Sequence, residues 1–97
     1  MRNIDVIKAF IDGKSACGSN LYSTGDKLVN YNTCIAQYYE ENNKPIYILN
    51  KSKYSFTTSK HQNALERLLC LKYAYKIIRV MSIPKNTLDL LKYGKYV

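Results

Sequence analysis

The stretch that decides how this chain folds is residues 53–62, which read Lys-Tyr-Ser-Phe-Thr-Thr-Ser-Lys-His-Gln. Ser59 and Gln62 have the spacing of a capping box, in which two side chains satisfy free N–H groups at a helix start. Beyond it, apolar residues recur at helical spacing. They are Ala64, Leu68, Leu71, Tyr75 and Ile78. We predict one long, largely buried helix that ends before Ile83-Pro84, because a residue that precedes proline avoids the helical conformation.

The residues before this stretch have the pattern of two β-hairpins. Gly25 lies in a short turn between two β-rich segments, and Glu-Glu-Asn-Asn-Lys-Pro at 40–45 separates two more. The predicted strands cover residues 21–23, 28–31, 33–39 and 46–49. Residues 14–20 are small and polar, and we predict a loop there.

Helical spacing also marks both ends of the chain. Residues 4–11 predict a short N-terminal helix, and residues 88–91 predict a last short helix that Gly94 closes. The expected fold is α+β, a single domain over residues 1–97. A short N-terminal helix and a small antiparallel sheet of about four strands, in two hairpins, would pack on the long C-terminal helix.

The positive charge is concentrated after residue 41. The chain has 15 lysines and arginines against 7 carboxylates, a formal net charge of +8. Residues 1–41 hold four cations and five carboxylates, and residues 42–97 hold eleven cations and two carboxylates, so the two parts carry −1 and +9. This asymmetry predicts a polyanionic partner, either nucleic acid or a nucleoprotein complex. A solvated, solubilising face is the alternative interpretation.

Composition also bounds the setting of the protein. No apolar run reaches the length of a membrane span, and Asp5 and Lys8 interrupt the apolar N-terminus, unlike a signal peptide. We expect a cytoplasmic protein with no membrane partner. Cys17, Cys34 and Cys70 are widely spaced, so we expect reduced thiols. A homodimer is an open alternative for so small a domain.

The predicted helix start is also a candidate anion site. Free N–H groups and the positive end of the helix dipole favour an anion at this position. A cation in the first turn, such as Lys60, is mildly unfavourable against the dipole, and an anionic partner would offset that cost. We expect a base to stack on Tyr54. The predicted nucleic-acid or anion-binding patch is Lys53, Tyr54, Thr57, Thr58, Ser59, Lys60 and His61, flanked by a basic stripe of Lys72, Lys76 and Arg79. A plain helix cap is the alternative.

Side chains that would support catalysis are few. His61 is the only histidine, which excludes a two-histidine acid–base pair, and the carboxylates are scattered rather than paired for two-metal chemistry. No second histidine or C-x-x-C completes a zinc site, and there is no glycine-rich phosphate loop. We predict no catalytic residue, no metal and no cofactor. A small nuclease that uses His61 with Lys60 or Tyr54 is an alternative.

Three strings of the sequence together resemble a group of small proteins of phages and other mobile elements. They are Gly-Ser-Asn-Leu-Tyr-Ser-Thr-Gly-Asp-Lys-Leu at 18–28, Tyr-Asn-Thr-Cys-Ile-Ala at 31–36 and Asn-Lys-Ser-Lys-Tyr-Ser-Phe-Thr-Thr-Ser-Lys-His-Gln at 50–62. The group shares the pattern N-L-x-S-x-G-x-x-L-x-S-Y-x-T-x-I-A, then N-x-x-K-Y-S-x-T-T-S-K-H-Q. Asn30 replaces a serine of this pattern, and Phe56 replaces a smaller residue. The resemblance implies a mobile-element protein that acts in a host cell.

These observations lead to one functional prediction and two alternatives. The prediction is a non-enzymatic phage or mobile-element protein that engages nucleic acid or a host nucleoprotein complex through its basic surface. By analogy with other small phage proteins, its sharpest form is an anti-CRISPR-like inhibitor of host defence. A stand-alone DNA- or RNA-binding regulator is the first alternative, and the nuclease centred on His61 is the second.

Overall fold

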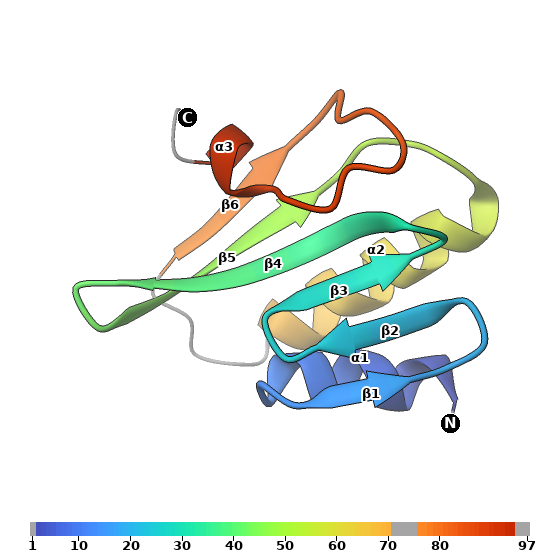
Figure 1. The fold of residues 1–97 in the computed structure, drawn as a ribbon, viewed down its shortest axis with the longest axis horizontal. Helices are drawn as coiled ribbons and strands as arrows, with labels where there is room; N and C mark the ends of the chain where they lie inside the picture. Colours follow the sequence, from blue (N-terminus) through green and yellow to red (C-terminus); the bar gives the residue numbers. More distant parts are fainter. Residues whose placement is uncertain (1, 71–75, 95–97) are drawn as a thin grey trace.

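The computed structural model describes residues 2–70 and 76–94 (Figure 1). The helices are α1 (Asn3–Ile11), α2 (Phe56–Cys70) and α3 (Leu91–Gly94), and the strands are β1 (Ser15–Cys17), β2 (Leu21–Thr24), β3 (Lys27–Asn30), β4 (Thr33–Glu41), β5 (Lys44–Asn50) and β6 (Lys76–Val80). Within the described residues the strands form one sheet of six in chain order, antiparallel except for the parallel pair β5 and β6. The α+β class is confirmed, but the predicted sheet of about four antiparallel strands is too small.

The predicted long C-terminal helix is wrong in its second half. α2 ends at Cys70, and residues 76–80 pair with β5 as β6. In β6, Ile78 and Val80 are buried while Lys76 and Arg79 are exposed. Ile78 and Val80 therefore follow the period of a strand, which β-branched side chains favour. α2 is the crossover helix that a parallel strand pair requires.

The remaining elements agree with the sequence in part. Both predicted hairpins and the N-terminal helix are confirmed. The loop prediction at 14–20 is wrong, because Ser15–Cys17 pairs with β2 as a short edge strand whose small polar residues give no alternation signal. The last helix begins at Leu91, later than predicted, because the Asp89 carboxylate accepts a hydrogen bond from the Leu91 N–H at 3.0 Å.

The start of α2 also differs from the predicted capping box. The helix begins at Phe56, and the Ser55 hydroxyl accepts a hydrogen bond from the Thr58 N–H at 3.2 Å, so Ser55 rather than Ser59 is the N-cap. Gln62 is buried, and its Nε2 donates to the carbonyls of Asn50 and Ser52. Gln62 therefore satisfies the backbone that leaves the end of β5 instead of the start of its own helix.

Each face of the sheet has its own cover and its own core (Figure 1). α1 and α2 lie on one face, where Phe10, Leu28 and Leu65 belong to a fully buried cluster. The segment that follows β6 crosses the opposite face, where Leu90 packs with Ile48 and other residues of β4–β6. No helix of the described residues is long and apolar enough to cross a membrane.

Candidate functional site

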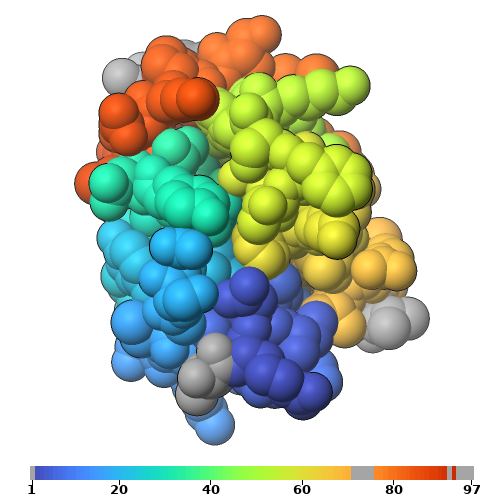
Figure 2. All heavy atoms as spheres, turned by 90° about the vertical axis from the view of Figure 1, so that its right-hand side faces the viewer, coloured from blue at the N-terminus to red at the C-terminus, as the bar shows by residue number. Residues whose placement is uncertain are grey.

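A pocket of about 460 Å³ opens where three separate segments meet: the β3–β4 turn, the start of α2 and the segment after β6. We call it the hairpin pocket. Figure 2 faces this end of the molecule, with the β3–β4 hairpin in teal, the start of α2 in yellow and residues 80–90 in orange. The pocket is lined by Asn30, Tyr31, Thr33, Tyr54, Ser55, Thr57, Thr58, Lys85 and Asn86.

The floor of the hairpin pocket is a satisfied polar network. Asn30 is 1% exposed and Thr58 is 4% exposed. The Thr58 hydroxyl donates to Asn30 Oδ1 at 2.7 Å and accepts from the Ser55 hydroxyl at 3.0 Å. Asn30 Nδ2 in turn donates to the carbonyl of Asn20 at 2.8 Å. Because these buried groups already have partners, they hold the walls in place and do not need a ligand.

A second set of hydrogen bonds fixes the segment after β6 against the rest of the pocket. The Tyr54 hydroxyl donates to the Ile83 carbonyl and accepts from Asn50 Nδ2 at 2.9 Å. The Asn86 N–H donates to the Thr33 hydroxyl at 2.9 Å. The sequence suggested Tyr54 as a free ring on which a base could stack. In the structure Tyr54 lines the pocket, and its hydroxyl is hydrogen-bonded to other residues of the protein.

Two residues of the pocket rim have an unusual backbone. Tyr31 has φ 49° and Asn86 has φ 67°, both in the left-handed region. Asparagine tolerates this conformation, whereas a bulky aromatic residue rarely adopts it. Tyr31 is also 53% exposed at the mouth of the pocket. The turn therefore holds an aromatic ring in solvent, beside a polar cavity.

Two other residues of the predicted patch, Lys60 and His61, line a different hollow. Lys60, His61 and Arg67 face α1 across an open groove of about 700 Å³, which we call the helix groove. Its other lining residues are Asn3, Ile4, Ile7, Asn63 and Ala64. The Lys60 ammonium lies 5.1 Å from the centre of the Phe56 ring, which is 77% exposed. The predicted patch is thus divided between two hollows.

His61 is half-buried, and burial lowers its pKa below the usual 6.5 because desolvation disfavours the charged form. The imidazole is therefore mostly neutral at pH 7. Among the described residues, no carboxylate lines the helix groove. Of the two partners considered for a nuclease, Lys60 lines this groove together with His61, whereas Tyr54 lines the hairpin pocket. His61 thus shares the helix groove with Lys60 but with no carboxylate of the described residues.

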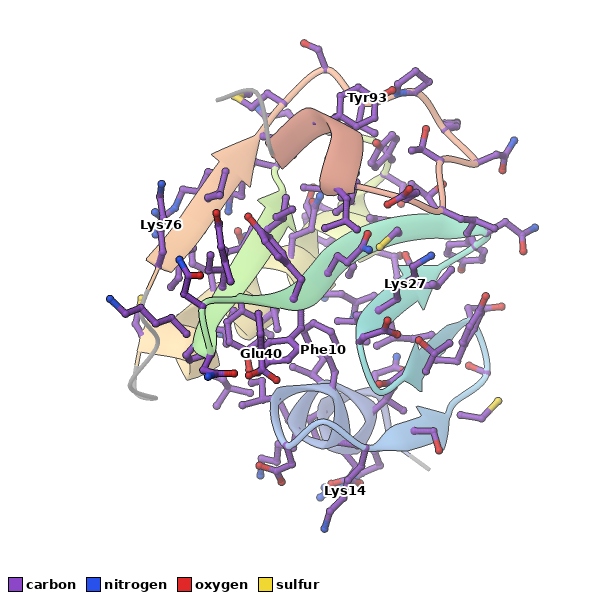
Figure 3. The ribbon with its side chains drawn as sticks, turned by 60° about the vertical axis from the view of Figure 1, so that its left-hand side comes forward. Phe10, Lys14, Lys27, Glu40, Lys76 and Tyr93 are labelled. Atoms are coloured by element: carbon purple, nitrogen blue, oxygen red, sulfur yellow. The ribbon has the colours of Figure 1, made fainter. Side chains whose placement is uncertain are left out.

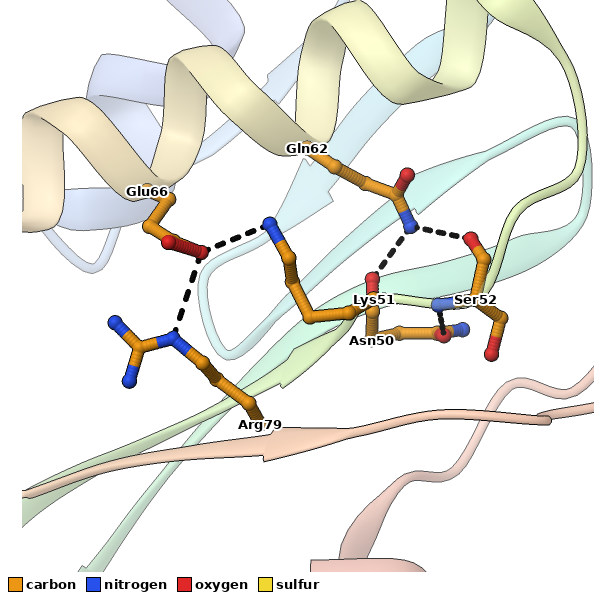
Figure 4. A network of polar contacts seen from close by, with 6 residues as sticks. All are labelled: Asn50, Lys51, Ser52, Gln62, Glu66 and Arg79. Atoms are coloured by element: carbon orange, nitrogen blue, oxygen red, sulfur yellow. Dashed lines mark hydrogen bonds and ion pairs between the residues drawn. The ribbon is translucent and has the colours of Figure 1, made fainter.

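The predicted basic stripe does not lie on one helix. Lys72 falls outside the described residues, and Lys76 and Arg79 lie on β6. Figure 3 shows Lys76 projecting from β6, away from the body of the molecule. Arg79 faces α2, where its Nε lies 3.5 Å from Glu66 Oε1, and Lys51 Nζ lies 2.8 Å from the same oxygen (Figure 4). Glu66 thus partly neutralises Arg79 and Lys51.

The other predicted residues have simpler environments. Lys53 is exposed in the linker between β5 and α2, and Ser59 is half-buried on α2. Tyr31, Lys85 and Asn86 belong to the hairpin pocket but not to the predicted patch. Tyr31 at the end of one predicted strand, with only Asn32 before the next, was a usable signal for a turn, and Pro-Lys-Asn at 84–86 was another. Nothing local in the sequence indicates that these turns meet.

The thiols and possible metal ligands suggest no chemistry at these sites. Cys17 and Cys70 are exposed free thiols, and burial raises the pKa of the Cys34 thiol to about 12. Among the described residues, no three histidine, cysteine, aspartate or glutamate side chains gather in a group that could hold a metal ion.

Comparisons with known proteins do not assign this arrangement to a family. No protein-family model, no curated protein and no solved structure matches the chain. The resemblance to mobile-element proteins therefore stays a prediction, and the geometry and charge of the described residues are the basis for a functional proposal.

Proposed function

We propose that this chain is a non-enzymatic binding protein that engages nucleic acid, free or within a nucleoprotein complex, through the basic surface built by residues 42–97. One observation carries the proposal. The exposed lysines and arginines of this surface outnumber the carboxylates that could neutralise them. Within the described residues, no ion pair engages Lys53, Lys60, Arg67, Lys76 or Lys85. Unpaired lysine and arginine side chains attract the phosphates of nucleic acid and release bound counterions, which favours association.

The arrangement of these cations supports a binding surface more than a solubilising one. Lys85 lines the hairpin pocket, and Lys60 and Arg67 line the helix groove. Each of these two hollows therefore has at least one cationic side chain in its lining. The carboxylates of residues 42–97 are engaged elsewhere. Glu66 pairs with Lys51 and Arg79, and the Asp89 carboxylate accepts from a backbone N–H. Charge that serves solubility alone has no reason to collect at concave surfaces.

A salt-titrated binding assay tests the proposal. Wild-type protein is mixed with labelled single-stranded RNA, single-stranded DNA and duplex DNA, and each dissociation constant is measured over a range of salt. We expect affinity to fall steeply with salt, with a slope set by the number of phosphates contacted. Lys53→Ala/Lys60→Ala should weaken binding and reduce the slope by about two. Lys8→Ala/Lys14→Ala removes the same charge from the other part of the chain and is the matched control.

The same assay separates the proposal from its sharper, anti-defence form. An inhibitor that acts on a host nucleoprotein complex would bind that complex and leave free nucleic acid unbound. Because this protein is basic, it is unsuited to mimic DNA and would have to meet guide RNA, target DNA or an acidic protein surface. Absence of binding to every free strand at low salt would contradict direct nucleic-acid recognition and leave a charged protein partner.

A further inference from the structure

We propose that the hairpin pocket takes one unstacked base of a single-stranded nucleic acid together with an adjacent phosphate. This inference rests on the nucleic-acid binding proposed above and names the part of the strand that the pocket would read. The volume of about 460 Å³ lies within the usual range of roughly 300–1,000 Å³ for small-ligand sites. Residues from three separated segments line it, so it is a feature of the assembled fold.

The backbone at Tyr31 points to a role for its ring. Two of the hairpin turns of the sheet, β3–β4 and β4–β5, provide an internal comparison, because each places two successive residues in the left-handed region. Asn42 and Asn43 form the turn between β4 and β5, as expected for residues that tolerate positive φ. The pocket turn has Tyr31 and Asn32 at these positions. A strained aromatic residue that stays 53% exposed gains little from packing, but it offers a flat face on which a base can stack.

The charge of the hairpin pocket suits the phosphate beside such a base. Among the described residues that line the pocket, Lys85 is the only charged one, and no carboxylate joins it there. Within the described residues, no hydrogen bond or ion pair occupies its ammonium. The side chains of Tyr31 and Thr57 are likewise without such a partner there. The pocket therefore combines a stacking face, a hydroxyl and a cation, all accessible to a ligand.

The rigidity of the pocket would lower the cost of binding. The Thr58–Asn30 and Asn86–Thr33 hydrogen bonds, of 2.7 Å and 2.9 Å, hold the three segments together. The groups that would meet the nucleotide are thus mounted on a frame whose own polar atoms are satisfied. A preformed site pays less ordering entropy when a ligand enters. An acidic peptide would use Lys85 but would make no comparable use of the exposed ring.

The test measures the anisotropy of short fluorescein-labelled oligouridylate and oligothymidylate with the full chain. Tyr31→Asn keeps a residue that suits the left-handed turn but removes the ring, and we expect it to weaken binding roughly tenfold. Tyr31→Phe keeps the ring and should bind like wild type. Lys85→Gln should weaken binding and reduce the salt slope by about one, whereas Lys14→Gln, which removes the same charge far from the pocket, should change both much less.

Two results would overturn the inference in distinguishable ways. If Tyr31→Asn binds like wild type while Lys85→Gln and Lys14→Gln weaken binding equally, the charge acts diffusely, so the pocket inference fails and the proposed function stands. If wild type binds neither strand at low salt, both fail. A third strand, oligodeoxyuridylate, has the same base as oligouridylate and tells whether a ribose 2′-hydroxyl contributes.

A titration followed by NMR keeps the test independent of any variant that fails to fold. Isotope-labelled wild-type protein is titrated with nucleoside 5′-monophosphates and, separately, with inorganic phosphate. We expect nucleotides to shift the amide signals of residues 30–33, 54–58 and 85–86 at concentrations where inorganic phosphate has little effect. Shifts spread evenly over the basic surface, equal shifts with inorganic phosphate, or none at all would overturn the pocket inference.

Discussion

The hydroxyl of Thr58 donates a hydrogen bond of 2.7 Å to Oδ1 of Asn30, which joins the first turn of α2 to the end of β3 across 28 positions of sequence. Both side chains are almost completely buried. Because Asn30 ends the strand before the Tyr31 turn, this bond fixes the distance between that turn and the helix. It is therefore the contact that gives the hairpin pocket its floor.

Replacing Thr58 with valine should destabilise the fold by about 1–3 kcal/mol, because the buried Asn30 oxygen loses its donor while the shape of the side chain is kept. Urea unfolding followed by circular dichroism measures the difference. Thr57→Val is the matched control. Its side chain is exposed, so the free energy of unfolding should change by less than about 0.5 kcal/mol. Equal losses in both variants would contradict this role of Thr58.

Ser55→Ala should cost about 1 kcal/mol of stability, because the hydroxyl that caps α2 accepts the Thr58 N–H. Ser59→Ala, at the residue that the sequence suggested as the cap, should change stability by less than about 0.5 kcal/mol. Thermal unfolding of the two variants under identical conditions compares them directly. A larger loss for Ser59→Ala would restore the capping box and place the start of α2 later.

The stability of the fold should depend on Glu66 at acidic pH. The Lys51 ammonium and, less directly, Arg79 hold the pKa of Glu66 below its usual 4.5, although burial opposes them. The unfolded chain therefore binds this proton more readily than the folded protein does. The pair's contribution is complete above pH 4.5 and is lost as the pH falls through the lower pKa of the folded state.

Glu66→Gln removes that titration. We expect the free energy of unfolding of the wild type to fall more steeply than that of the variant as the pH is lowered from neutrality past 4.5. Urea unfolding at a series of pH values gives both curves. Because the pair is partly exposed, the difference should shrink as salt is added. Parallel curves at every pH would mean that Glu66 titrates alike in both states.

Local signals in the sequence were sufficient for the hairpins and insufficient for the site. Gly25 and the polar run at 40–45 identify turns, and a turn fixes the antiparallel pairing of its neighbours. β6 had no such signal, because its partner β5 precedes it by a whole helix and its isoleucines also fit helical spacing. The residue types alone did not decide between the two periods.

The candidate site was predicted in part for the same reason. Tyr54, Thr57 and Thr58 do line a pocket, as residues of one helix start can be expected to lie together. Tyr31 and Lys85 reach it only through tertiary contacts such as the bond between Asn30 and Thr58. Lys60 and His61, adjacent to these residues in sequence, lie on α2 facing α1 and so belong to the helix groove.

Replacing His61 with alanine tests the alternative of a nuclease. Because burial lowers the pKa of His61, the ring is mostly neutral at pH 7 and adds little charge to the basic surface. We therefore expect His61→Ala to bind single-stranded nucleic acid as tightly as wild type at pH 7, and labelled strands incubated with either protein to stay intact. Cleavage by the wild type that disappears in His61→Ala while affinity is kept would identify His61 as a general base or acid and overturn the non-enzymatic proposal. Cleavage that persists in the variant would instead point to a contaminating nuclease or to groups other than His61.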